Sequence, residues 1–65
     1  MARVEFGKVW NVTTMADLVT AWDALDENEF SAKMSDDSAR EARELDEVAR
    51  QRKQVARAAR DAGII

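Results

Sequence analysis

Residues 38–62 read SAREARELDEVARQRKQVARAARDA, and this stretch dominates the folding pattern of the chain. It contains a seven-residue repeat, in which Glu41, Val48 and Val55 start successive heptads and are each followed by Ala and Arg. A heptad repeat of this kind places small and apolar side chains along one side of an α-helix. No glycine or proline occurs until Gly63, so the pattern predicts one uninterrupted C-terminal helix.

Two starting points are compatible with this helix. Ser35 is followed by two aspartates that suit a first helical turn, whereas Ser38 and Glu41 form a full capping box. Gly63 suits the position just after a helix, where the next residue can make the apolar contact of a Schellman-type end. We therefore predict a long helix within residues 36–62, about 36 Å in length.

This helix carries a narrow, alanine-rich stripe that would let another helix approach closely. We predict that the stripe is an interface formed by Ala42, Leu45, Val48, Ala49, Arg52, Val55, Ala56 and Ala59. Two partners are open at this point: the first helix of the same chain, or a helix of a second chain. The long helix is about twice the length of the first predicted helix, so part of the stripe would overhang the chain's own core.

Arg52 interrupts the apolar stripe. A charged side chain in such a position needs an oppositely charged partner or access to water. Either the side chain extends to water, or it pairs with a carboxylate such as Glu44 of another chain and sets the register of the interface.

Charge is separated along the same helix. Residues 36–47 contain six acidic and two basic residues, whereas residues 50–60 contain five basic residues and no acidic one. The helix dipole accounts for charges in the first and last turns but not for those in the middle. Two antiparallel copies would place each acidic half against the other copy's basic half, so we predict an antiparallel homodimer.

Apolar and polar residues alternate near the N-terminus, which is typical of a β-strand. The apolar residues of this pattern are Val4, Phe6, Trp10 and Val12. Three arrangements of residues 4–12 are open: a hairpin with a two-residue loop at Gly7 and Lys8, a hairpin with a three-residue loop, or one continuous strand paired with a partner strand from elsewhere.

A first helix is predicted to follow. Thr14 and Asp17 resemble a capping box. Five apolar residues then recur at helical spacing: Met15, Leu18, Val19, Trp22 and Leu25. We predict an amphipathic helix over residues 15–26, followed by a short helical turn that carries Phe30 and Met34.

These elements predict a single small domain over residues 1–65, of the α+β class and mostly helical. The order is a short N-terminal strand or hairpin, an amphipathic helix, a short helical turn and a long C-terminal helix. Residues 1–34 would form a mini-core and residues 36–62 the long helix. A chain of this size buries only about 60% of the surface that its unfolded form exposes, so we expect a partner chain to add stability.

The composition argues against catalysis, because the chain has no His and no Cys. It lacks the usual base near neutral pH, a thiol nucleophile and the commonest zinc ligands, and we predict no enzyme activity, no metal site and no cofactor. The acidic run that ends at Phe30 departs from an EF-hand loop, which needs an oxygen ligand at this position and a glycine where Ser31 stands. No apolar run is long enough to span a membrane and no signal-peptide pattern is present, so we predict a cytoplasmic protein.

Basic residues recur on the side of the long helix opposite the stripe. The candidate contacts with nucleic acid or an acidic partner are Arg43, Arg50, Lys53, Arg57 and Arg60. Acidic residues flank this group, no aromatic residue interleaves with it, and the net charge of the chain is −3. These features disfavour nucleic acid as the partner.

The order of strand, helix, loop and longer helix resembles that of ribbon-helix-helix DNA-binding proteins. The matching pieces are residues 4–12, residues 15–26 and the chain from Ser38 onward. The resemblance implies that the N-terminal strands of two chains pair and enter the major groove of DNA. The segment between the helices is longer than that family's short turn, and Glu5 would face phosphate.

The function that these patterns favour is a small non-catalytic protein–protein interaction module, acting as an adaptor, an inhibitor or an assembly component. It would self-associate or bind a heterologous protein through the long helix. Trp10 and Trp22 are candidate hot spots if either is exposed. A DNA-binding regulator similar to ribbon-helix-helix proteins is the alternative.

Overall fold

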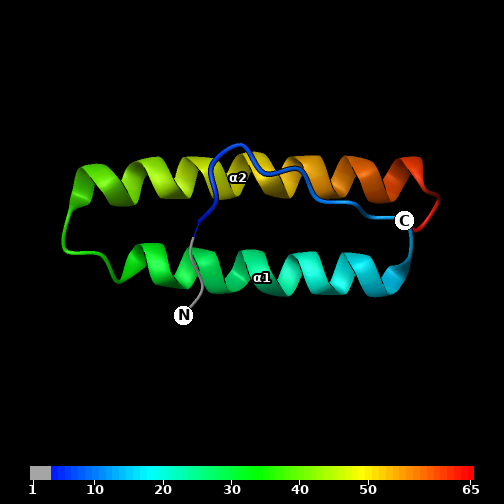
Figure 1. Ribbon diagram of the computed structural model, residues 1–65, viewed down its shortest axis with the longest axis horizontal. Helices are drawn as coiled ribbons and strands as arrows, with labels where there is room; N and C mark the ends of the chain where they lie inside the picture. Colours follow the sequence, from blue (N-terminus) through cyan, green and yellow to red (C-terminus); the bar gives the residue numbers. More distant parts are fainter. Residues whose placement is uncertain (1–3) are drawn as a thin grey trace.

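The computed structural model describes residues 4–65, which form a hairpin of two helices (Figure 1). α1 spans Met15–Lys33 and α2 spans Ser38–Asp61, and residues 34–37 connect them so that they run antiparallel. The molecule is elongated, with extents of 39 × 18 × 15 Å. Residues 4–13 turn back over α2 and follow it toward the start of α1, so the hairpin carries a third, non-helical layer on one side.

α1 begins at the predicted capping box. The Thr14 hydroxyl accepts a hydrogen bond from the Asp17 N–H, and the Asp17 carboxylate accepts one from the Thr14 N–H, each at 3.2 Å. The prediction that this helix ends at residue 26 is wrong, because α1 continues through the predicted helical turn to Lys33. An ion pair of 3.2 Å between Lys33 and Glu29 stabilises its last turn.

The start of α2 differs from both predicted caps. Asp37 is the N-cap, and its carboxylate accepts hydrogen bonds from the N–H groups of Ala39 and Arg40 at 3.0 and 3.2 Å. A carboxylate suits this position because it also interacts favourably with the positive end of the helix dipole. Ser35 and Ser38 lie on either side of the cap that the chain uses.

The end of α2 is the predicted Schellman motif. Gly63 has a φ of +77°, which a glycine adopts without steric cost. The Ile64 N–H donates to the Ala59 carbonyl at 2.9 Å, and the Gly63 N–H donates to the Arg60 carbonyl at 3.1 Å. Ile64 then packs against the core, as expected of the residue that closes this motif.

The predicted N-terminal strand or hairpin is wrong, because residues 4–65 contain no β-strand. The chain makes a turn closed by a 3.4 Å hydrogen bond from the Lys8 N–H to the Glu5 carbonyl, with Gly7 at a φ of +81°. Beyond the turn the segment follows α2 and not another strand. Beyond the turn, the backbone of the segment hydrogen-bonds to side chains of α2 in place of a strand partner. The fold of the described residues is all-helical, and the strand on which the ribbon-helix-helix resemblance depends is missing from them.

The core joins all three layers. Its buried apolar members are Val4, Val12, Ala21, Leu25, Val48, Val55 and Ala59. Leu25 of α1 and Val55 of α2 are fully buried where the two helices meet. Val4 and Val12 reach the same cluster from the two ends of the N-terminal segment. Residues 1–3, part of the predicted mini-core, lie outside the described residues.

Within residues 4–65, neither helix combines the length and the apolar character that a membrane span requires.

Candidate interaction surfaces

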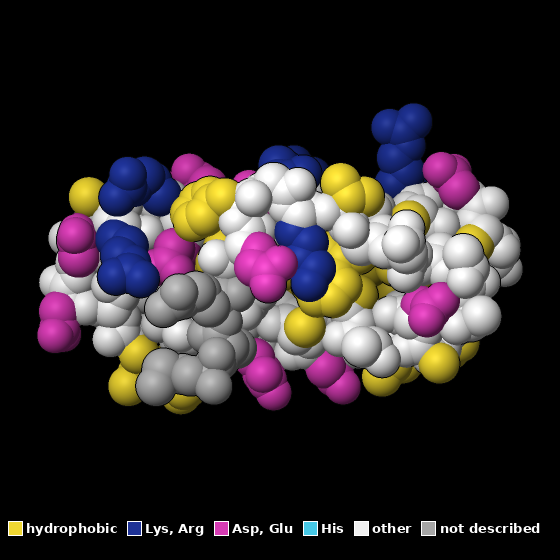
Figure 2. Space-filling model, viewed as in Figure 1, with side chains coloured by type: hydrophobic (Ala, Val, Ile, Leu, Met, Phe, Trp, Pro, Cys, Tyr) yellow, Lys and Arg dark blue, Asp and Glu magenta, His cyan; other side chains and the backbone are white. Residues whose placement is uncertain are grey.

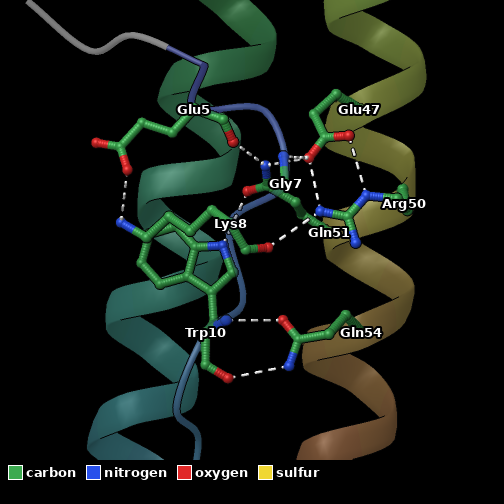
Figure 3. Close-up of polar contacts among 8 residues, drawn as sticks. All are labelled: Glu5, Gly7, Lys8, Trp10, Glu47, Arg50, Gln51 and Gln54. Atoms are coloured by element: carbon green, nitrogen blue, oxygen red, sulfur yellow. Dashed lines mark hydrogen bonds and ion pairs between the residues drawn. The ribbon is translucent and has the colours of Figure 1, made fainter.

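The N-terminal segment is bound by a row of polar side chains on α2, drawn in Figure 3. We call this row the segment-binding face, and it consists of Glu47, Arg50, Gln51 and Gln54. Their spacing of three or four residues places them on neighbouring turns of one helix face. All four make hydrogen bonds to residues 5–10.

Gln54 binds the backbone of Trp10 at two points (Figure 3). Its amide oxygen accepts from the Trp10 N–H, and its amide nitrogen donates to the Trp10 carbonyl, both at 2.9 Å. This pair of bonds reproduces what a neighbouring β-strand would offer to one residue. A side-chain amide thus replaces a strand partner at this position.

Gln51 is the centre of the face and is only 1% exposed. Its amide oxygen accepts from the indole Nε1–H of Trp10 at 2.9 Å, and its amide nitrogen donates at 2.7 Å both to the Glu5 carbonyl and to the Glu47 carboxylate. These three bonds satisfy the amide inside the protein, which is the condition for burying it at low cost.

Glu47 and Arg50 complete the face. The Glu47 carboxylate accepts a hydrogen bond from the Gly7 N–H at 2.9 Å. Arg50 donates to both oxygens of the Glu47 carboxylate and also to the Lys8 carbonyl, the latter at 3.0 Å. The Arg50 guanidinium and the Gln51 amide lower the pKa of the Glu47 carboxyl from its ordinary 4.5 to about 2. The same ion pair raises the pKa of Arg50. The carboxylate is therefore charged at neutral pH although it is nearly buried.

The outer surface of the segment is mixed in character. The Lys8 ammonium lies 3.9 Å from the centre of the Trp10 ring and 3.6 Å from the Glu5 carboxylate. Phe6 and Val9 point away from the helices and are largely exposed. Figure 2 shows this side of the molecule, where charged side chains of both signs lie among apolar ones.

A second surface lies along a different side of the hairpin, and we call it the open side. It contains a groove of about 400 Å³ between α1, α2 and the C-terminus. The groove is lined by Leu18, Val19, Trp22, Asp23, Ala56 and Ile65. Five of these six side chains are apolar, so water in the groove has few polar partners.

An exposed apolar stripe of α1 continues from this groove. Met15, Val19 and Trp22 are separated by four and three residues and are 54%, 51% and 38% exposed. Phe30 lies two turns beyond Trp22 and is also exposed. A helix that packed only within its own chain would turn these side chains inward, so the stripe is a surface without a covering layer in the described part of the chain.

Arg52 crosses from α2 to α1 beside the groove. One of its terminal nitrogens lies 2.6 Å from the Asp26 carboxylate and 3.4 Å from the Glu29 carboxylate. Its guanidinium is 4.8 Å from the centre of the Trp22 ring. Lys33 and Arg52 lower the pKa of Glu29. The charge in the apolar stripe is thus neutralised within the chain, while Glu44, the partner suggested from another chain, pairs with Arg40.

The structure divides the predicted interface of α2 into two groups. Val48, Val55 and Ala59 are buried in the core. Ala42 and Ala49 are exposed, while the other three members are partly buried: Leu45, Arg52 and Ala56. The stripe therefore serves the chain's own core along one edge, and its other edge belongs to the open side.

The predicted basic contacts are spread over several environments. Arg50 belongs to the segment-binding face, and Arg43 borders a depression of about 650 Å³ beside Val4 and Phe6. The remaining three are exposed along the second half of α2: Lys53, Arg57 and Arg60. The structure thus brings these five cations to no single site.

Sequence reasoning missed the segment-binding face. The signal available in the sequence is that Gln51 and Gln54 are the only glutamines in the chain and, together with Glu47, follow helical spacing beside Val48 and Val55. Each amide carries both a donor and an acceptor, so these two side chains are able to bond to a backbone N–H and C=O together.

Residues 4–65 contain no group of three or more acidic side chains placed to hold a metal ion. No protein-family model, curated protein or solved structure matches this chain.

Proposed function

We propose that this protein is a non-catalytic protein–protein interaction module that self-associates through its open side. The observation that carries the proposal is the apolar groove between the helices, together with the exposed stripe of Met15, Val19 and Trp22 that continues from it. Exposed apolar surface of this kind is a marker of protein interaction sites, and an aromatic side chain near its centre is a typical hot spot.

Charge supports a second copy as the occupant. α1 carries five acidic residues and one basic residue, whereas residues 50–60 of α2 carry five basic residues and no acidic one. An antiparallel pair of hairpins would place the acidic helix of one copy beside the basic half of α2 of the other. The exposed Ala49 and the partly buried Ala56 would allow close approach of the helices.

Sedimentation equilibrium over a concentration series tests this proposal. We expect a monomer–dimer equilibrium that shifts toward the monomer at about 0.5 M salt, because salt screens the complementary charges. Val19→Glu should weaken the dimer at least about tenfold, because it places a carboxylate in the apolar interface.

Val9→Glu is the matched control, since Val9 is 67% exposed but lies on the N-terminal segment, away from the groove. It should leave the dimer unchanged. A wild-type monomer at every concentration would contradict self-association, and equal weakening by both substitutions would contradict the open side as the interface.

A further inference from the structure

The contacts of the N-terminal segment indicate that α2 carries a recognition site for the backbone of a short chain segment. Four of the hydrogen bonds from the segment-binding face go to backbone groups of Gly7, Lys8 and Trp10, and a fifth goes to the Glu5 carbonyl. Backbone groups are common to all residues, so these bonds specify the path of the backbone: a turn at residues 5–8 and then a stretch that follows α2. The Trp10 indole bond to Gln51 adds a requirement for one side chain.

Buried apolar residues at the two ends of the segment define the length of chain that the face accommodates. Val4 and Val12 are 7% and 5% exposed, and both contact the core formed by the helices. Phe6 and Val9 between them face solvent. The face and the core therefore favour a segment with an apolar residue at each end, a turn after the first and a tryptophan two positions before the last, as in residues 4–12.

Nothing in these contacts requires the segment and the face to belong to one chain. The bonded residues of the segment and of α2 are 40 to 46 positions apart in sequence. The segment joins α1 through Thr13 and Thr14, which are exposed, and the Thr14 cap bonds only to its own helix. A second copy offers the identical segment with identical complementarity, so exchange conserves every bond of the bound state.

We propose that the segment-binding face is an acceptor site that takes residues 4–12 of a second copy when the chain's own segment is released. The covalent segment competes with the incoming one at an effective concentration of roughly millimolar or more, which keeps the site closed in dilute solution. This site lies apart from the open side, and it does not depend on the dimer proposed there.

A peptide of residues 4–13, VEFGKVWNVT, is the direct probe. The receptor is the full chain with Trp10→Ala, which weakens its own segment while leaving the face intact. We expect saturable binding of a fluorescent peptide by fluorescence anisotropy, at least about tenfold tighter than to the wild-type chain, whose own segment competes.

Adding Gln54→Leu to the receptor should weaken peptide binding at least about tenfold, because the two bonds to the Trp10 backbone are lost. A peptide with the tryptophan replaced by alanine should bind the Trp10→Ala receptor as weakly as the unchanged peptide binds the receptor that also carries Gln54→Leu. Trp10→Phe serves as a second receptor, since it keeps the ring and removes only the indole N–H, and circular dichroism verifies that each receptor is helical.

Exchange between chains is tested by mixing two full-length variants, both with Val19→Glu to suppress association through the open side. One has a weakened segment, Trp10→Ala, and the other a weakened face, Gln51→Leu with Gln54→Leu. We expect a heterodimer in the mixture and monomers in each variant alone. Absence of saturable peptide binding by both helical receptors, or binding that is insensitive to Gln54→Leu, would overturn the acceptor site. Peptide binding without a heterodimer would overturn exchange between copies.

Discussion

Two sides of the same helical hairpin differ in how they are completed. On one side, α2 presents Glu47, Gln51 and Gln54, and the N-terminal segment covers these three side chains and hydrogen-bonds to each of them. On the other, α1 presents Val19 and Trp22 beside a groove that no described residue fills. On these two sides, outside the apolar core, Glu47 and Gln51 are buried while Val19 and Trp22 are exposed, which is the reverse of the usual distribution.

The contrast teaches which surface the chain needs for its own stability. A buried amide is costly without partners, so the segment-binding face requires its segment. An exposed apolar stripe is compatible with the folded monomer, so it is available for a partner. Gln51 and Arg52 illustrate this difference, because consecutive helical residues point about 100° apart and these two lie on different sides.

The largest effect is expected from Gln51→Ala. The substitution removes a nearly buried amide and leaves the partly buried Glu5 carbonyl and Trp10 indole N–H without their partner. We expect the free energy of unfolding to fall by about 2 to 4 kcal/mol in urea titrations. Lys53→Ala, two residues along α2 at an exposed position, is the control and should change it by less than about 0.5 kcal/mol. A similar loss in both variants would mean that the buried amide has no special role.

The second-largest effect is expected from acid, which protonates Glu47 of the segment-binding face and lowers the free energy of unfolding. The pKa of Glu47 is about 2 in the folded state against an ordinary 4.5, so its stabilisation is complete above pH 4.5 and is lost as the pH falls toward 2. The pKa values of Asp17 and Glu29 are lowered too, which gives the same sign. We expect Glu47 to contribute roughly 1 to 3 kcal/mol to this loss. Urea titrations between pH 7 and pH 2.5 measure it.

Glu47→Gln separates this contribution from the others. The variant should be less stable at neutral pH and should lose less stability on acidification than the wild type. An unchanged acid profile would assign the sensitivity to the remaining carboxylates.

Gly7→Ala should have an intermediate effect. The glycine has a φ of +81°, and an added Cβ meets no atom within 4 Å, so the cost is conformational. We expect a loss of about 1 kcal/mol, with a change in Trp10 fluorescence as the segment loosens. Gly63→Ala, at a φ of +77° after α2, should cost a similar amount and leave this fluorescence unchanged. Equal fluorescence changes would contradict a local effect on the segment.

The smallest effect is expected on the open side. Arg52→Ala removes ion pairs with Asp26 and Glu29 and the contact with Trp22, but both carboxylates stay accessible to water. We expect a loss below about 1 kcal/mol that shrinks further at high salt, as is typical of exposed ion pairs. Thermal unfolding at low and high salt measures it. A loss as large as that of Gln51→Ala would show that the two sides contribute equally to folding.

Local signals in the sequence were sufficient to locate both helices, the start of α1 and the end of α2, but not the end of α1 or the N-cap of α2. The heptad repeat predicted α2, the capping box of Thr14 and Asp17 predicted the start of α1, and Gly63 predicted the Schellman end. Each of these features depends on residues within one or two turns of each other. The Asp37 cap was missed because Ser35 and Ser38 offer similar chemistry nearby, and propensity alone separates them poorly.

The N-terminal segment shows where sequence patterns lose their meaning. Alternation from Val4 to Val12 correctly marks the two buried ends of the segment, but Phe6 within it is exposed and residues 5–8 form a turn, and the pattern does not identify what the segment bonds to. Periodicity reports which side chains face inward, whereas hydrogen-bond partners can come from any element that lies alongside. In this molecule they come from Gln51 and Gln54, more than 40 positions away.

The sequence by itself determined the approximate positions of α1 and α2 and the separation of charge along α2, because these properties depend on neighbouring residues and composition. Tertiary structure alone decided which edge of the α2 stripe is buried, where the charge of Arg52 is neutralised, and that side-chain amides take the place of a β-strand. Those outcomes depend on how the segment, α1 and α2 share one small core, and packing of this kind is a property of the whole chain.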